Sequence, residues 1–334
     1  MPGNNPILRF KLEDIGPIKS AEIGLGRVAI LYGANATGKT TVARALAYLV
    51  KVLNGFNIRC SELLDLIGTP QKDSTEGSAA MMALGGYEVS LRRPRMWNKV
   101  AVAVKKGGEV LYSGECSGGA VSTGLHVGGD LGIDLLAWVK YGKVLIVDAN
   151  SSEGEVALGL RGLLNPNIVR RYITAGISNA KAASDFEDYV LDVSHALSSV
   201  AGWHVANQHG SIYFINGVDF YEPSNVAGGI RRAALILAAK VLMERARRLG
   251  RLPIMFIEGL DPLHIDLIEG VLDAFEDSEV PSIIEAHNAF ALKYAALRNW
   301  NAYVLKDGYA YTDLTRPELF AREAVVVSEV GEVL

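Results

Sequence analysis

Apolar and polar positions alternate near the start of the chain and predict short strands there. Ile7–Leu12 and Ala21–Leu25 have this period of two and flank a turn at Ile15–Ile18, whereas the continuous apolar run Val28–Tyr32 indicates a buried strand. The period becomes helical in Thr41–Leu53. The pattern therefore predicts two paired strands, a buried strand, a short loop and a helix in succession.

The middle of the chain predicts a layer of strands followed by a layer of helices. Turn residues divide 86–112 into the short alternating segments of a β meander. Residues 166–201 follow a helical pattern, which is clearest in Ala180–Leu197. Short apolar runs at Val144–Val147 and Ile212–Asn216 predict strands on either side of these helices.

The last third of the chain predicts buried strands that alternate with helices. Pro253–Glu258 and Pro281–His287 are apolar strands ending in a polar residue, and Val226–Ile230 opens the helix Arg231–Leu249. We therefore expect an α/β fold of two lobes: a mixed sheet with a parallel core, an antiparallel β layer and a helical subdomain. The predicted segments of this single domain, 1–334, are 1–55 (first strands and loop), 56–209 (β layer and helices) and 210–334 (the remaining motifs).

A phosphate-binding loop lies between the buried strand and the first helix, because residues 33–40 match G-x-x-x-x-G-K-[ST] at every fixed position. Glycines let the backbone close around a polyphosphate, and the helix N-terminus favours its negative charge. We expect Lys39 to be an exposed cation at the β/γ-phosphates and the Thr40 hydroxyl to support Mg²⁺. The residues predicted to hold ATP here are Gly33, Ala34, Asn35, Ala36, Thr37, Gly38, Lys39, Thr40 and Thr41.

Composition limits the class of protein. The chain has 334 residues, 49% of them hydrophobic, and a formal net charge of −4, so we expect a globular protein without a surface-wide nucleic-acid footprint. No apolar run approaches the ~18 residues of a membrane span, which predicts a cytoplasmic protein without a membrane partner. Cys60 and Cys116 form no C-x-x-C pair, and we expect small apolar residues, neither a disulfide nor zinc ligands.

Further candidate groups lie in the second half of the chain. Gly228 and Gly229 open a helix, which is a second anion-binding device. Glu258 ends one apolar strand and His287 ends another. Asp148 also ends an apolar run, but such an aspartate is common in α/β proteins, so we do not assign it to the site.

The order and spacing of these motifs resemble the heads of ABC-type ATPases in the group of structural-maintenance-of-chromosomes (SMC), RecF and double-strand-break-repair proteins. The resemblance covers nearly the full chain, beginning with the paired strands around Phe10–Ile23. Val226–Ile230 lies where that family has its Leu-Ser-Gly-Gly-Gln signature, Glu258 falls in the Walker B strand, and His287 matches the switch histidine that hydrogen-bonds the γ-phosphate. The motif halves are not separated by a coiled coil, so the resemblance implies a stand-alone head.

The resemblance also implies an ATP-dependent homodimer, in which Ala227, Gly228 and Gly229 of one subunit cap the γ-phosphate held by the other. Ala227 stands in place of the signature serine and has no hydroxyl to donate, so we expect a weaker cap unless Ser224 or Asn225 substitutes.

Two roles in the family's site stay open on the sequence. The family ends its Walker B strand in Asp-Glu, where the first acid serves Mg²⁺ and the second polarises the attacking water. If the apolar residues before Glu258 set the register, Glu258 takes the metal position and Gly259 leaves the base position empty. Counted from Leu263–His264, Glu258 is the water-polarising base and Ile257 stands where the metal ligand should be. The family also has a glutamine that joins Mg²⁺ to the attacking water, and Gln71 is a better candidate for it than Gln208, which falls too close to the signature.

The predicted function is a slow, Mg²⁺-dependent ATPase head acting in DNA repair or chromosome maintenance, with DNA or a DNA-repair protein as a partner implied by the resemblance. The alternatives are the nucleotide-binding subunit of a transporter and a P-loop kinase for a small molecule. Basic clusters at 92–99 and 245–251 are expected to be solvated surface charge in an acidic protein.

Overall fold

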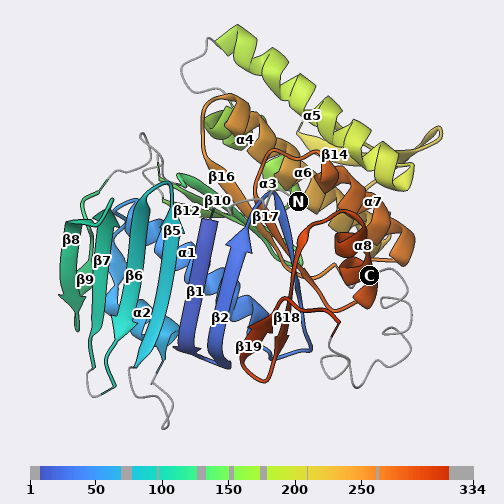
Figure 1. Cartoon of the computed structure of the whole chain (residues 1–334). Helices are drawn as coiled ribbons and strands as arrows, with labels where there is room; N and C mark the ends of the chain where they lie inside the picture. The colour runs from blue at the N-terminus through green and yellow to red at the C-terminus, as the bar shows by residue number, and fades with distance from the viewer. Residues whose placement is uncertain are drawn as a thin grey trace.

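The computed structural model describes residues 8–68, 77–95, 98–125, 133–149, 154–173, 179–208, 210–260 and 263–315. Within these ranges, one mixed sheet of 14 strands runs through the molecule (Figure 1). The chain is an α/β protein, as its pattern of strands and helices predicts.

Five parallel strands form the central part of this sheet. In spatial order they are β10 (Leu135–Val139), β16 (Pro253–Ile257), β17 (Ser282–Ala286), β3 (Val28–Tyr32) and β18 (Asn301–Lys306). Because parallel strands end at the same edge, the loops that follow β3, β10, β16 and β17 meet there, which is where α/β sheets bind ligands.

Further strands extend the parallel core on both sides. On one side, β19 (Tyr309–Tyr311) leads to β2 (Ile18–Leu25), β1 (Leu8–Ile15), β5 (Ser78–Leu84), β6 (Tyr87–Arg93), β7 (Val100–Lys106) and β8 (Glu109–Cys116). On the other side lie β11 (Val144–Asp148) and β12 (Glu155–Leu158). All of these strands pair in antiparallel fashion except β19 with β2. The predicted antiparallel layer is thus a continuation of the core sheet, seen at the left of Figure 1.

Helices cover the two faces of the sheet separately. The face behind the antiparallel strands in Figure 1 carries α1 (Lys39–Leu53) and α2 (Cys60–Ile67). The other side carries α3 (Leu160–Leu163), α4 (Pro166–Ile173), α5 (Asn179–Ala201), α6 (Gly228–Arg248), α7 (Ile265–Glu276) and α8 (Ala289–Leu297). A separate small sheet on that side consists of β13 (His204–Gln208), β14 (Ser211–Asn216) and β15 (Asp219–Tyr221), followed by a 3₁₀ helix (Pro223–Asn225).

Successive residues of the central strands point into two different cores. Phe256 of β16 and Ile283 of β17 belong to the core that contains α1. Their neighbours Ile257 and Ile284 belong to the core that contains α6. With a side-chain period of two, Glu285 therefore shares the α1 side of the sheet with Ile283.

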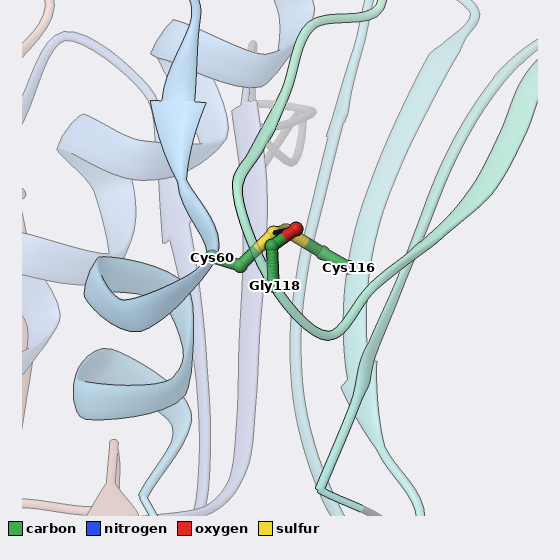
Figure 2. Close-up of a disulfide and its surroundings, with 3 residues drawn as sticks. All are labelled: Cys60, Cys116 and Gly118. Carbon is green, nitrogen blue, oxygen red and sulfur yellow. Dashed lines mark hydrogen bonds between the residues drawn. A yellow bond between two sulfur atoms is a disulfide. The ribbon is translucent and has the colours of Figure 1, made fainter.

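The two cysteines form a disulfide, so the prediction that they are unpaired is wrong. Cys60 at the start of α2 and Cys116 at the end of β8 are both buried, with Cα atoms 5.3 Å apart (Figure 2). The pair is brought together by β4 (Ile58–Arg59) and β9 (Ala120–Val121), which are antiparallel neighbours. Their separation of 56 residues gave no local signal for this contact.

Candidate functional site

The loop between β3 and α1 needs its glycines for steric reasons. Gly38 has φ 106°, and a Cβ there would lie 2.6 Å from the side chain of Ile18. A Cβ on Gly33 would lie 2.7 Å from the carbonyl oxygen of Leu305. Ala36 also has a left-handed backbone, with φ 64°. The loop therefore folds back tightly at the edge of the sheet.

The loop ends in an open helix N-terminus. The first helical bond of α1 runs from the Val42 N–H to the Gly38 carbonyl, 3.0 Å away. The preceding N–H groups of Lys39, Thr40 and Thr41 have no acceptor within the helix and carry the positive end of its dipole. Thr40 is exposed, as are loop residues 34–36, so an anion can reach these groups.

Lys39 is buried at this end, contrary to the prediction of an exposed cation. Its Nζ donates to the carbonyl oxygens of Gly33 (2.7 Å) and Ala34 (2.8 Å). The same Nζ lies 3.3 Å from Nδ1 of His287 and 3.9 Å from Oε1 of Glu285. The loop thus folds around its own lysine, which holds the charge near the place where phosphate would bind.

The end of β17 contributes two of these groups. Glu285 is 6% exposed, and its Oε1 lies 3.3 Å from Nε2 of His287. The sequence identified His287 but missed Glu285. The available signal was an acid inside an apolar strand, two residues before the histidine and hence on the buried side of a strand next to β3.

Glu258 lies at the end of β16, close to Thr40. Burial raises the pKa of Glu258, and the Lys140 ammonium, the Trp138 indole and the Thr40 hydroxyl act against this rise. Its Oε1 is buried and has no hydrogen-bond partner among the described residues. The Glu258 carboxylate and the Thr40 hydroxyl thus lie close together near the helix N-terminus, and both are oxygen donors of the kind that Mg²⁺ prefers.

The positions on either side of Glu258 offer no second acid. Ile257 is fully buried in the core on the α6 side. Gly259 has φ 65°, and a Cβ there would lie 2.7 Å from the hydroxyl of Tyr141. Tyr141 therefore occupies the space into which a side chain at position 259 would extend.

Lys140 and Tyr141, which sequence reasoning missed, follow β10. The parallel register pairs Val139 with Ile257, which places Lys140 beside Glu258. Arg232 of α6 fixes this arrangement by donating to the carbonyl oxygens of Lys140 and Glu258. No local pattern could have indicated this neighbourhood, since the pairing of β10 with β16 creates it.

The predicted signature residues begin α6. Ala227 is the N-cap residue and makes no side-chain cap, and Ala227 and Gly228 are exposed while Gly229 is half-buried. Arg232, farther along the same helix, reaches the carbonyl of Glu258. The first turns of α6 are therefore joined to the end of β16, and the start of the helix is accessible from outside.

Other predicted residues lie elsewhere or outside the described ranges. Gln71 falls outside the residues that the structure describes, so its role stays a prediction. Asp148 accepts from Arg251 at 2.6 Å, which agrees with its exclusion from the site. Arg251 also pairs with Asp134, and Arg245 pairs with Asp192, so the prediction that these two arginines are solvated surface charge is wrong.

Comparison with known proteins gives structural matches only. No family model and no curated protein matches the chain. The SMC head domain from Thermotoga maritima aligns with TM-score 0.47 and 14% identity over 90% of this chain and 96% of that one. RecF with ATP aligns with TM-score 0.44 and 12% identity over 91% of this chain and 98% of that one. An ATP-binding subunit of an ABC transporter aligns with TM-score 0.42 and 14% identity over 97% of this chain and 99% of that one.

The first two of these solved structures are of proteins that the motif order resembles, and the third is of a subunit of a transporter. At these scores the assignment of function rests on the geometry of the chain itself. None of the helices in the described ranges is long and apolar enough to cross a membrane. Within the same ranges, no three His, Cys, Asp or Glu side chains gather as a metal cluster.

Proposed function

We propose that this chain is an ATP-binding and ATP-hydrolysing head of the ABC type. The observation that carries the proposal is the convergence at one sheet edge of the glycine loop, the open N-terminus of α1, Lys39 and His287. A polyphosphate on this edge would accept from the backbone N–H groups of residues 39–41 and would draw the Lys39 ammonium from the loop carbonyls.

The site also suits Mg²⁺. Glu258 Oε1 is a buried oxygen without a partner among the described residues, and the Thr40 hydroxyl is its neighbour. Mg²⁺ takes one or two protein oxygens and completes its shell with phosphates and water, so a larger acidic cluster is not required. Bound there, the ion would neutralise charge that develops on the phosphates. We assign Glu258 to the metal position, with Gly259 in the empty base position.

The hydrolysis step places the terminal phosphate between Lys39 and His287. Lys39 would hold its oxygens as a point charge, and His287 would contact it from the end of β17. The signature residues Ala227, Gly228 and Gly229 would cap the same phosphate from a second copy of the chain. The dimer and a role on DNA are supported by the resemblance of the motifs.

Replacement of Lys39 by alanine tests the nucleotide site. We expect Lys39→Ala to abolish tight binding of ATP with Mg²⁺ in titration calorimetry, because the phosphate loses its central cation. Lys99→Ala, which removes a surface cation paired with Glu115, is the control and should bind ATP as the wild type does. Since Lys39 is buried, Lys39→Met keeps its volume if the alanine variant unfolds. Unchanged ATP affinity in a folded variant would contradict the proposal.

A further inference from the structure

The hydrogen bonds that Lys39 donates determine which ring nitrogen of His287 acts as an acceptor. A lysine ammonium has three protons to donate and no acceptor. Gly33 and Ala34 carbonyl oxygens take two of them, at 2.7 and 2.8 Å, and Nδ1 of His287 lies 3.3 Å from the same nitrogen. Nδ1 therefore faces Lys39 as an acceptor.

The other ring nitrogen then carries the proton. A neutral imidazole with an acceptor at Nδ1 is protonated at Nε2. Nε2 of His287 lies 3.3 Å from Oε1 of Glu285, so this proton is directed at a buried carboxylate. The arrangement is that of a nucleophile-activating base whose tautomer and orientation are fixed by an acid behind it.

We propose that His287 and Glu285 form the general-base dyad of the hydrolysis reaction, with His287 as the catalytic residue and Glu285 as its positioning residue. This inference rests on the function proposed above. It explains how a site with Gly259 at the position of the usual base can activate water, since Glu258 is the neighbour of Thr40 and serves the metal.

In the proposed reaction, one proton passes from water to the dyad. When phosphate draws the Lys39 ammonium away, Nδ1 of His287 is left with its lone pair toward the terminal phosphate. The water oxygen bonds to the γ-phosphorus, the bond from phosphorus to the bridging oxygen breaks, and its electron pair leaves with ADP. The water proton moves to Nδ1, and the Glu285 carboxylate stabilises the imidazolium through Nε2–H. The proton then leaves to phosphate or solvent.

Charged groups surround the dyad from several elements. Lys39 faces it from α1, and Glu258 lies at the end of β16 next to Lys140 from β10. Arg232 lies on α6, where burial lowers the pKa of its guanidinium to about 10 and the charges of Glu258 and Glu285 act against this change. All of these groups stay in place in a Glu285→Gln variant, which keeps the shape of the side chain and removes only its charge.

The test is a double-mutant cycle on single-turnover hydrolysis at saturating ATP and Mg²⁺. We expect Glu285→Gln and His287→Ala each to slow hydrolysis by about 10²-fold. The double variant should be no slower than His287→Ala alone, because Glu285 acts only through His287. The ATP dissociation constant of Glu285→Gln should stay within about threefold of wild type, a split that general loss of structure would not give. Glu244→Gln, which breaks an ion pair with Lys240 on α6, is the matched control.

Several outcomes would overturn the dyad. They are a wild-type rate in Glu285→Gln, additive losses in the double variant, and a wild-type protein that binds ATP without hydrolysing it. If Glu285→Gln does not fold, Glu285→Asp retains the charge but withdraws the oxygen by one methylene, and an undiminished rate there refutes the dyad. Failure of the wild-type protein to bind ATP would instead refute the proposed function itself.

Discussion

Glu258 carries a charge in a place where burial opposes it. Burial raises the pKa of Glu258 above its ordinary value of 4.5, so the folded protein binds this proton more tightly than the unfolded chain does. The stability gained from the protonated carboxyl is complete below about pH 4.5 and is lost as the pH rises through the raised pKa. At neutral pH, the ionised Glu258 therefore weakens the nucleotide-free fold.

The raised pKa of Glu258 predicts that removing its charge stabilises the nucleotide-free protein. In the absence of nucleotide, Glu258→Gln should unfold at a higher temperature than wild type near pH 8, and the difference should shrink as the pH falls toward 5. Thermal unfolding followed by circular dichroism across this range measures it. With ATP and Mg²⁺ the wild type should gain more stability than the variant, because only the carboxylate serves the metal. A gain that is constant with pH would show that ionisation of Glu258 is not its cause.

Single residues of the site were predictable to the extent that a local motif determines them. The loop residues 33–40 and His287 could be identified from the sequence, because the loop pattern and the strand end have a direct chemical meaning. Tyr141 could not, since its importance comes from the pairing of β10 with β16. Glu285 was missed although an acid inside an apolar strand was a signal for it. The burial of Lys39 was also missed, because it depends on carbonyl groups and a carboxylate from a different strand.

Among the elements, α2 and β8 are held together by the disulfide Cys60–Cys116. The bond closes a loop over a sequence separation of 56 residues, and closing such a loop restricts the unfolded chain. We expect the double variant Cys60→Ser, Cys116→Ser to lose about 2–4 kcal/mol in free energy of unfolding. Urea titration checks this, with wild type in reducing buffer as the matched comparison. Equal midpoints in wild type with and without reductant, with the thiols shown to be free, would contradict it.

The start of α6 gives a second prediction at this scale. Ala227 has the extended backbone of an N-cap residue but offers no oxygen to the free N–H groups of the helix. Ala227→Ser should therefore stabilise the nucleotide-free protein by about 1 kcal/mol. Chemical unfolding of wild type, Ala227→Ser and Ala227→Val distinguishes capping from packing, since valine has no oxygen for the cap. An equal gain from valine would show that packing, not capping, is responsible.

Elements with a strong local period were the ones that the sequence could predict. The sequence of strand, loop and helix in β3 and α1 follows from a change of period around glycines. β10 was missed, although all five of its residues are buried, because a short apolar run without alternation does not distinguish strand from helix. Its parallel pairing with β16 is a contact between distant segments, and that pairing brings Lys140 to Glu258.

At the scale of the whole molecule, the two anion-binding devices lie on different elements. The loop and α1 offer one at the sheet edge, and the exposed residues Ala227 and Gly228 begin α6. A phosphate held by Lys39 can be capped from the far side by the second device of another copy. We therefore expect ATP to convert monomer to dimer, which light scattering detects, and Glu285→Gln to favour the dimer because it slows hydrolysis while ATP stays bound.

Ala227, at the predicted signature position, would set the strength of the proposed dimer. Ala227 cannot donate to the γ-phosphate, and a hydrogen bond to a charged group contributes about 1.5–3 kcal/mol. In the Glu285→Gln background with ATP, Ala227→Ser should lower the dimer dissociation constant by at least about tenfold. Ala227→Gly, which also lacks the hydroxyl, should leave it within a few-fold. The serine cap stabilises the fold of each subunit with or without nucleotide. The test is therefore the change in the dimer dissociation constant that requires ATP. A strict monomer with ATP at high protein concentration would mean that the start of α6 is a helix terminus only, or that a different protein completes the site.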